Sequence, residues 1–288
     1  MTETMRKLAR EEFPGNLSEI PDPPDELFVL GTIPPLEHTF ICVVGSRKHT
    51  SYGKEAAERI IAGLAGYPIV IVSGLAIGID SIAHAAALNA GLITLAVPGS
   101  GLNENVLYPA SNRLLAKKII ERGGALISPF KPDFKATEWS FPARNRIMAG
   151  MSQAVLLIEA EEKSGTGITA RLALDYNRDV YAVPGSIFSP TSRGTNALIA
   201  GGATPITQSA DLLTALGFEV RDNAKISSPA PENMSPDEHM LWELLREPIS
   251  RDDLVRMLKM PTSRASEVMS LMEIKGLIKD IAGKIMRA

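Results

Sequence analysis

The chain has 288 residues, of which 45% are hydrophobic and 22% charged, and its net charge at neutral pH is −3. This balance is typical of a globular protein and excludes a disordered, collagen-like or coiled-coil chain. The pI of about 5.9 lies far below the value near 9 that is usual for nucleic-acid-binding domains, so any basic surface must be local.

The residue content also bears on metal binding and location. The single cysteine, Cys42, cannot form an internal disulfide or a cysteine zinc site, and the four histidines lack metal-ligand spacing. We therefore expect no metal and no cofactor. No apolar run approaches the roughly 18 residues of a membrane helix. Residues 1–12 are charged and lack the apolar core of a secretory signal, so we expect a cytoplasmic protein with no membrane contact.

The first 39 residues are predicted to be a lead-in to the first domain. Residues 1–12 have the composition of a charged helix, and the prolines within 21–24 form a stiff, extended breaker.

From residue 40 to residue 217, short apolar segments alternate with helical patterns. The apolar segments are rich in Val and Ile, as strands covered by helices on both faces must be. Such alternation predicts an α/β fold, an extended Rossmann-like domain with a doubly wound, mostly parallel sheet. The predicted strands are residues 40–44, 69–72, 93–97, 125–127, 155–158, 180–183 and 204–206; the predicted helices are residues 54–64, 81–89, 112–121, 168–176 and 210–216, with a shorter one from about 143.

Residues 218–235 are rich in Asp, Asn, Ser and Pro, which predicts a linker. Residues 236–288 follow with the pattern of a small winged-helix domain, three helices and a hairpin. The predicted third helix, residues 263–275, would be the recognition helix of a duplex reader. Its charges cancel, which favours a protein-interaction or dimerisation module over a DNA reader, although both remain open.

Four predicted turns that carry glycine follow strands of the sheet: residues 45–48, 73–80, 99–101 and 164–169. Right-handed crossovers place such turns at one edge of a parallel sheet. Glycine lets a ligand approach the backbone closely, and helix N-termini offer N–H groups to an anion. The turns therefore predict an anion-binding crevice, although tight β→α turns without a ligand would have the same composition.

Several standard sites do not match. The Gly-Lys pair at 53–54 is followed by Glu55, and Lys48 stands where a P-loop needs its first glycine. No Gly-x-Gly-x-x-Gly follows the first strand, which argues against a standard NAD site. Asp80 and His84 share one helix face and could form an acid–base pair, but a turn-capping Asp and a packed His are the simpler interpretation.

Basic and aromatic residues lie near the predicted crevice. Arg47 is in the first turn, and Phe141, Arg144 and Asn145 follow the fourth strand, with Lys135 upstream. Arginine can hold a phosphate through two hydrogen bonds, and an aromatic ring can stack on an unpaired base. This combination favours single-strand binding. The alternative, in which the rings lie in the core and the arginines pair with carboxylates, remains open.

These segments resemble the DprA/Smf family of DNA-processing proteins of bacterial natural transformation, and residues 236–288 are similar to the winged-helix domain of many members. The matching segments are Ile20–Pro24, Val44–Arg47, Ser73–Asp80, Tyr108-Pro109, Phe141–Ile147, Glu159-Ala160, Ser164-Gly165, Ile168–Arg171 and Ser192–Asn196.

The resemblance implies a homodimer that binds and protects incoming single-stranded DNA, without strong sequence preference, and loads the RecA recombinase onto it. It implies no catalytic residue. Together with the patterns above, it assigns nucleic-acid binding to Gly45, Ser46, Arg47, Lys48, Ser73, Gly74, Ala76, Gly78, Lys135, Phe141, Arg144, Asn145, Ser164, Gly165 and Thr166.

The chain departs from the family pattern in places. Many members carry a helical N-terminal domain, which we expect to be absent or truncated here. The fourth turn reads Ser-Gly-Thr-Gly-Ile-Thr where the common pattern has Ser-Leu in the middle, and the acidic Glu138 lies within the aromatic–basic segment.

The alternative function is a nucleotide- or nucleotide-sugar-binding enzyme. Residues 165–167 faintly resemble the phosphate loop of the lysine-decarboxylase-like (LOG) proteins, which share a Rossmann-like core. That family has a catalytic Glu after the loop, whereas this chain has Thr169–Arg171 there.

Overall fold

The computed structural model describes residues 4–14, 16–162, 164–220, 234–245, 249–281 and 283–287. The chain forms two compact units, Met1–Val220 and Arg221–Ala288, each of which is described by itself. Most of the predicted linker, residues 218–235, lies outside the described residues.

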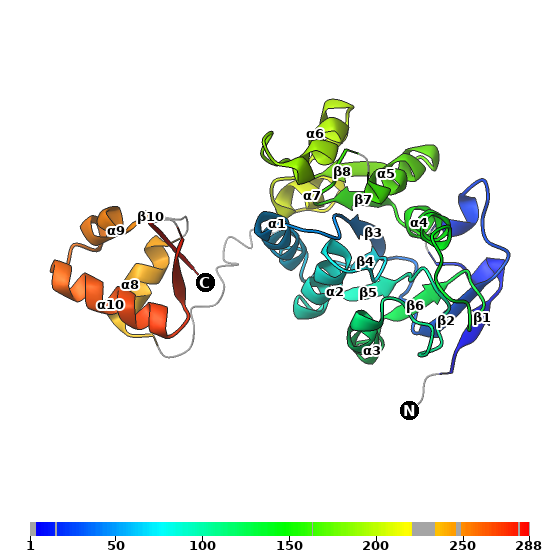
Figure 1. Ribbon diagram of the computed structural model, residues 1–288, viewed down its shortest axis with the longest axis horizontal. Helices are drawn as coiled ribbons and strands as arrows, with labels where there is room; N and C mark the ends of the chain where they lie inside the picture. The colour runs from blue at the N-terminus through cyan, green and yellow to red at the C-terminus, as the bar shows by residue number, and fades with distance from the viewer. Residues whose placement is uncertain are drawn as a thin grey trace. The chain divides into compact units, whose positions relative to one another are not determined.

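A nine-stranded sheet forms the centre of the larger unit (Figure 1). All of the neighbouring pairs are parallel except for the two at one edge, so the sheet is mostly parallel, as predicted. In their order across the sheet, the strands are β1 (Arg6–Leu8), β2 (Leu27–Gly31), β6 (Ala125–Ser128), β5 (Ile93–Ala96), β4 (Ile69–Ser73), β3 (Thr39–Val44), β7 (Ala154–Leu157), β8 (Asp179–Ala182) and β9 (Thr204–Pro205).

Helices cover both faces of this sheet. Alternate residues of β3 enter two separate core clusters: Phe40 and Cys42 enter one, and Ile41 and Val43 enter the other. Burial on both faces explains why the strands are apolar throughout. The helices are α1 (Ser51–Ala62), α2 (Ile79–Asn89), α3 (Arg113–Glu121), α4 (Ser140–Met151), α5 (Gly165–Asp175), α6 (Arg193–Ala200) and α7 (Ser209–Ala215), with single 3₁₀ turns at Arg10–Glu12, Leu17–Glu19, Ala110–Asn112 and Pro190–Ser192.

The strand order reverses at the middle of the sheet. β3 lies between β4 and β7; the chain leaves β3 toward β4 through α1, but it leaves β7 toward β8, on the opposite side, through α5. Neighbouring strands whose connections diverge leave a crevice at their carboxyl ends, where α/β sheets bind ligands.

The structure differs from the prediction in residues 1–39. These residues are not a separate lead-in, because β1 and β2 extend the sheet and pair antiparallel, with β2 bonded to β6. The predicted helix at 1–12 is wrong: it is replaced by β1 and one 3₁₀ turn. Leu8, Leu27 and Val29 are buried in the core, so burial against distant parts of the chain overrides the local helical composition.

The smaller unit is a winged helix, as predicted. Its three helices pack with a three-stranded antiparallel sheet around a core that includes Leu241, Trp242 and Met269. The Ser235 hydroxyl accepts a hydrogen bond from the Glu238 N–H and begins the first helix. The elements are α8 (Pro236–Leu244), β10 (Ile249–Ser250), α9 (Arg251–Leu258), α10 (Thr262–Ile274), β11 (Ile278–Ile281) and β12 (Lys284–Arg287).

Candidate nucleic-acid interface

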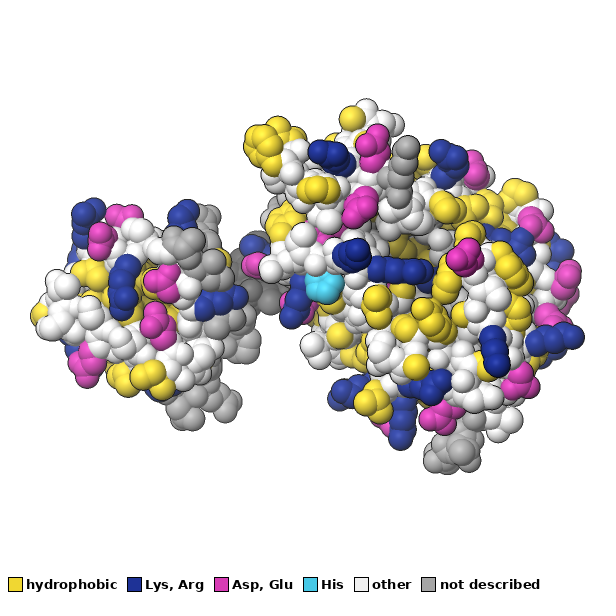
Figure 2. All heavy atoms as spheres, in the orientation of Figure 1, with side chains coloured by type: hydrophobic (Ala, Val, Ile, Leu, Met, Phe, Trp, Pro, Cys, Tyr) yellow, Lys and Arg dark blue, Asp and Glu magenta, His cyan; other side chains and the backbone are white. Residues whose placement is uncertain are grey.

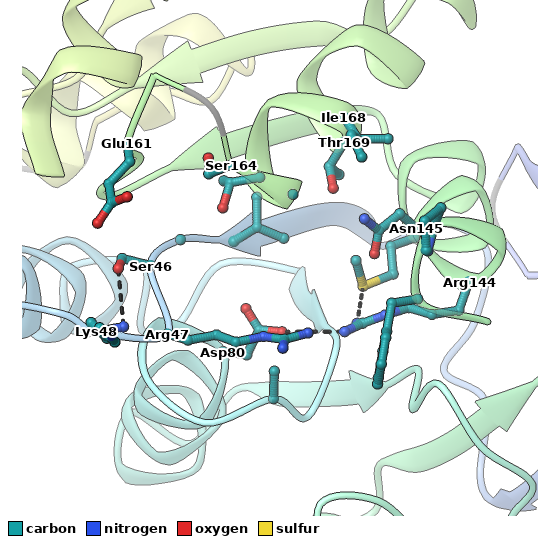
Figure 3. Close-up of a pocket in the computed structure, with 18 residues that line it drawn as sticks. Ser46, Arg47, Lys48, Asp80, Arg144, Asn145, Glu161, Ser164, Ile168 and Thr169 are labelled. Atoms are coloured by element: carbon teal, nitrogen blue, oxygen red, sulfur yellow. Dashed lines mark hydrogen bonds and ion pairs between the residues drawn. The ribbon is translucent and has the colours of Figure 1, made fainter. Parts of the chain in front are cut away.

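A cleft of about 490 Å³ lies where β3 and β7 end, at the reversal of strand order (Figure 3). Three of the predicted turns and the start of α4 contribute to it. The predicted residues that line the cleft are Gly45, Ser46, Arg47, Lys48, Ala76, Phe141, Arg144, Asn145, Ser164, Gly165 and Thr166.

The turn after β3 has a fixed backbone. The Ser46 carbonyl accepts a hydrogen bond from the Ile79 N–H at 3.2 Å, and the Ser46 hydroxyl accepts one from the Lys48 N–H at 3.0 Å. Gly78, at φ +88°, packs so closely that a Cβ there would lie 2.4 Å from the Ser46 carbonyl oxygen. These contacts hold the turn against the start of α2 and leave the side chains of Arg47 and Lys48 exposed.

Arg47 and Lys48 supply the positive charge of the cleft. Neither forms an ion pair with a carboxylate among the described residues. The Arg47 guanidinium lies over the ring of Phe141, 5.0 Å from its centre. Figure 2 shows Lys and Arg side chains beside hydrophobic ones across the middle of the larger unit. Cations without carboxylate partners beside an aromatic ring can bind a phosphate directly.

Arg144 also lines the cleft, but unlike Arg47 it is buried and bonded within the protein. Its side chain is 4% exposed. The guanidinium lies 3.8 Å from the Asp80 carboxylate and donates to the Val97 carbonyl oxygen at 3.1 Å. Asp80 in turn accepts a hydrogen bond from the Gly74 N–H at 3.1 Å. Arg144 therefore ties α4 to two loops from beneath the cleft surface.

Burial and mutual attraction shift the pKa values of Asp80 and Arg144 in opposing directions. Burial raises the pKa of Asp80, and the nearby Arg144 guanidinium and backbone N–H groups oppose that rise. Burial also lowers the pKa of Arg144, and Asp80 opposes that change. Each charge therefore stabilises the ionised form of the other. Gly74 packs against the pair so tightly that a Cβ there would lie 1.3 Å from a guanidinium nitrogen of Arg144.

The opposite wall of the cleft comes from the start of α5 and from α4 (Figure 3). The N–H groups of Gly165 and Thr166 lie in the first turn of α5, where a helix has no internal acceptors for them. Ser164, Thr169 and Asn145 present uncharged polar side chains on the same wall.

Four predicted residues lie outside the cleft lining. Ser73 is buried, and its hydroxyl donates to the Val43 carbonyl oxygen at 2.7 Å. Gly74 packs against the Arg144 guanidinium, Gly78 packs against the backbone of Ser46 and Arg47, and Lys135 is exposed. The sequence prediction omitted seven lining residues, several of which fall in motifs already noted: Val44, Asp80, Pro142, Met148, Glu161, Ile168 and Thr169.

Asp80 and His84 do not form an acid–base pair. His84 is buried, and its Nδ1 lies 2.7 Å from the Thr94 hydroxyl oxygen. That hydroxyl donates its own proton to the Ile71 carbonyl oxygen, so Nδ1–H is the donor to Thr94. Burial lowers the pKa of His84 to about 3, which keeps the ring neutral. Among the described residues, no group of three His, Cys, Asp or Glu side chains could hold a metal ion.

The cations of the winged helix are arranged differently. Arg264, near the start of α10, bonds Asp237 at 2.8 Å and Glu267 at 3.0 Å. Lys275, directly after the last residue of α10, bonds Glu238 at 2.6 Å. Both of these positive charges are therefore paired with carboxylates within the unit.

In the part of the chain that the structure describes, no helix is long and apolar enough to cross a membrane.

Known proteins similar to this chain share its sequence over most of its length. It is 42% identical over 206 residues to DNA processing protein DprA of Streptococcus pneumoniae, covering 72% of each chain. It is 40% identical over 230 residues to Protein Smf of Escherichia coli, covering 79% of this chain and 60% of that protein. The chain thus spans less than two thirds of the Escherichia coli relative.

Solved structures of similar proteins have the same fold. DNA processing protein A of Streptococcus pneumoniae has a TM-score of 0.69 and 38% identity over 76% of each chain. The Helicobacter pylori protein, whose structure concerns its single-stranded DNA binding mode, has a TM-score of 0.66 and 30% identity over 74% of this chain and 96% of that one. Residues 4–217 match the family model for DNA recombination-mediator protein A, and residues 225–284 match the family model for the DprA winged helix domain. The chain therefore belongs to the DNA recombination-mediator protein A (DprA/Smf) family.

Proposed function

We propose that this protein binds single-stranded DNA in the cleft between β3 and β7, protects it, and delivers it to a RecA-type recombinase during DNA uptake. The observation that carries this proposal is the pair Arg47 and Lys48. Both are exposed at the edge of a sheet whose reversal of strand order makes a ligand crevice, and neither forms an ion pair with a carboxylate among the described residues.

The aromatic residues favour an unpaired strand over a duplex. The ring of Phe141 lies under the Arg47 guanidinium. The centre of the exposed Tyr108 ring lies 5.8 Å from the centre of the Phe141 ring. Rings at such a surface can stack on unpaired bases, which in a duplex are already stacked on their neighbours. Backbone phosphates would lie along Arg47 and Lys48 and at the first turn of α5, where free N–H groups favour an anion.

The relatives support the same ligand. The Helicobacter pylori structure is described for its mode of binding single-stranded DNA, and it matches 74% of this chain. The Streptococcus pneumoniae relative is named a DNA processing protein. Binding of this kind requires no catalytic residue. His84 is buried and neutral and bonds Thr94, so it does not act with Asp80 as an acid–base pair.

The test is fluorescence anisotropy of a labelled oligo-dT of about 30 nucleotides, titrated at two salt concentrations with duplex DNA and mononucleotides as competitors. We expect tight, salt-sensitive binding that duplex competes poorly. Failure to bind the oligonucleotide, together with release of free base or ribose phosphate from mononucleotides, would instead favour the LOG-like enzyme.

Two finer parts of the proposal need their own experiments. We expect a homodimer, which light scattering of the purified chain measures directly. We also expect the protein to speed the assembly of RecA on single-stranded DNA already covered by a single-strand-binding protein. RecA filaments that form at the same rate with and without the protein would leave strand binding intact and remove the loading role.

A further inference from the structure

The sequence Val-Pro-Gly-Ser occurs twice in the chain, directly after β5 and directly after β8. In both copies the serine hydroxyl accepts a hydrogen bond from the backbone N–H of an exposed aromatic residue. Ser100 accepts from Tyr108 at 3.1 Å, and Ser186 accepts from Phe188 at 3.3 Å. Because β5 and β8 lie on opposite sides of the boundary between β3 and β7, the two turns present one exposed ring on each side of the cleft.

A separate pocket of about 530 Å³, which we call the side pocket, is lined by the start of α1 and by the loop after β8. Its volume is within the roughly 300–1,000 Å³ usual for ligand pockets. Tyr52, which is 49% exposed, lies in its lining. Phe188, which is 87% exposed, lies between the lining residues Ser186 and Ser189. Figure 2 shows hydrophobic side chains on the surface at the loop that precedes α6.

The side pocket adjoins the cleft along two segments of the chain. Arg47 and Lys48 line the cleft, and Thr50, shortly after them, lines the side pocket. In the segment after β7, Glu159 lines the side pocket and Glu161 lines the cleft. A strand whose phosphates lie along Arg47 and Lys48 can therefore continue into the side pocket.

The walls of the side pocket are held by a buried carboxylate. Glu159 is 1% exposed, and it accepts hydrogen bonds from the Thr50 N–H at 2.9 Å, from the Thr50 hydroxyl at 2.6 Å and from the Thr191 hydroxyl at 3.0 Å. The Tyr52 hydroxyl donates to the Pro184 carbonyl oxygen and so joins α1 to the turn after β8. The pocket is thus formed before any ligand binds, as ligand pockets usually are.

The chemistry of the side pocket favours a base over a phosphate. The Glu159 carboxylate repels a phosphate, whereas exposed rings can stack on any of the four bases. A cation lies at its border: Arg193 directly follows the lining residue Ser192, is exposed and forms no ion pair with a carboxylate among the described residues. A phosphate can therefore bind Arg193 while its base enters the pocket. Bases within a duplex are already stacked on their neighbours, so the ligand is an unpaired strand.

We propose that the side pocket, with Phe188 and Tyr52, is a stacking site for the single strand that leaves the cleft. This inference rests on the proposed function, and it lengthens the DNA-binding surface beyond the cleft. The strand crosses the cleft along Arg47 and Lys48, and a further base then stacks at the side pocket. The repeated turn thus gives the strand an aromatic contact on both sides of the cleft.

The experiment compares two labelled oligonucleotides of about 12 nucleotides, a length within the site sizes of single-strand binders. One is oligo-dT. The other has the same phosphates but carries thymine only on roughly 4 central nucleotides and abasic sugars elsewhere, so that it fills little more than the cleft. In anisotropy titrations of the full chain, Phe188→Ala should bind oligo-dT at least about fivefold more weakly than wild type, because a stacked base is lost. Its affinity for the abasic oligonucleotide should stay within about twofold of wild type.

Three further variants separate stacking from other roles of this loop. Ile187→Ala is the matched control, because Ile187 is 75% exposed beside Phe188 but has no ring, and it should change neither affinity by more than about twofold. Tyr52→Leu removes the other ring and should weaken binding of oligo-dT more than binding of the abasic oligonucleotide. Ser186→Ala removes the acceptor for the Phe188 N–H and should cause a smaller loss in the same direction. Light scattering gives the mass of each variant.

Wild-type affinity for oligo-dT in both Phe188→Ala and Tyr52→Leu would overturn the inference and leave the proposed function intact. An equal loss on both oligonucleotides would also overturn it, and a lower mass would then assign Phe188 to a contact between two copies of the chain. Failure of the wild-type chain to bind oligo-dT at all would overturn the proposed function, and the inference with it.

Discussion

The cleft of the larger unit and helix α10 of the winged helix differ in how their cations are paired. In the larger unit, Arg47 and Lys48 stand at a ligand crevice with no carboxylate partner among the described residues. In the winged helix, Arg264 bonds two carboxylates and Lys275 bonds a third. A winged helix that reads duplex DNA needs cations available on its recognition helix. The cations of the cleft are therefore available to a ligand, whereas Arg264 and Lys275 are held by carboxylates of the winged helix.

Arg144 is a paired cation within the larger unit, in contrast to Arg47. The substitution Gly74→Ala should push the Arg144 guanidinium away from Asp80 and leave a buried charge without its partner. We expect a loss of about 3–5 kcal/mol in the free energy of unfolding, measured by urea denaturation. Gly165→Ala is the control, because no atom lies within 4 Å of a Cβ there. A Gly74→Ala variant as stable as that control would show that the pair is not rigid.

Arg47 tests the unpaired side of the comparison. Arg47→Ala should weaken binding of single-stranded DNA about tenfold, because it removes the cation over Phe141, to which the proposed function assigns a phosphate. Anisotropy of labelled oligo-dT at low salt gives the affinity, and circular dichroism verifies the fold. Unchanged affinity in a folded variant would place the DNA elsewhere.

Glu238 tests whether the cations of the winged helix serve stability. Its carboxylate bonds Lys275, which is the main reason that its pKa is lowered, and it also accepts from the Ser235 N–H. Glu238→Ala should cost about 1 kcal/mol at neutral pH, followed through Trp242 fluorescence in a Trp139→Phe background.

The pH dependence of that cost has a definite sign. A lowered folded pKa means that the stabilisation is fully present above the ordinary value of 4.5 and disappears as the pH falls through the folded pKa. The difference in the free energy of unfolding between wild type and Glu238→Ala should therefore become smaller in acid. An equal difference at pH 7 and pH 3 would contradict the ionic origin.

The smallest effect is expected at Arg264. Arg264→Ala should change the affinity for single-stranded or duplex DNA by less than about twofold, because its charge is already neutralised by Asp237 and Glu267. Gel-shift titration with both forms of DNA measures this. A tenfold loss on duplex would make α10 a recognition helix after all.

Much of this arrangement could be predicted from local sequence. The strands and glycine turns depend on short-range patterns, and right-handed crossovers then gather the turns at one edge of the sheet. Arg47, Lys48 and Ser46 could therefore be placed at the crevice without a structure. The balance of charges on α10 already indicated that this helix lacks a basic face.

The remainder depends on contacts between distant residues. β1 pairs with β2, as at Arg6 and Val29, and β2 pairs with the much more distant β6, as at Phe28 and Ser128. Local composition does not report such pairings. Arg144 and Arg47 are both arginines beside a predicted crevice, yet only the fold brings Asp80 against Arg144.

The most direct test of DNA binding at Arg47 and Lys48 is the salt dependence of single-strand binding in three chains: wild type, the double variant Arg47→Ala/Lys48→Ala, and Arg264→Ala. For single strands the slope of log affinity against log salt changes by about 0.7 for each phosphate contact. We expect the slope to become shallower by about 1.4 in the double variant and to be unchanged in Arg264→Ala. A wild-type slope in the double variant, or a shallower slope in Arg264→Ala, would contradict it.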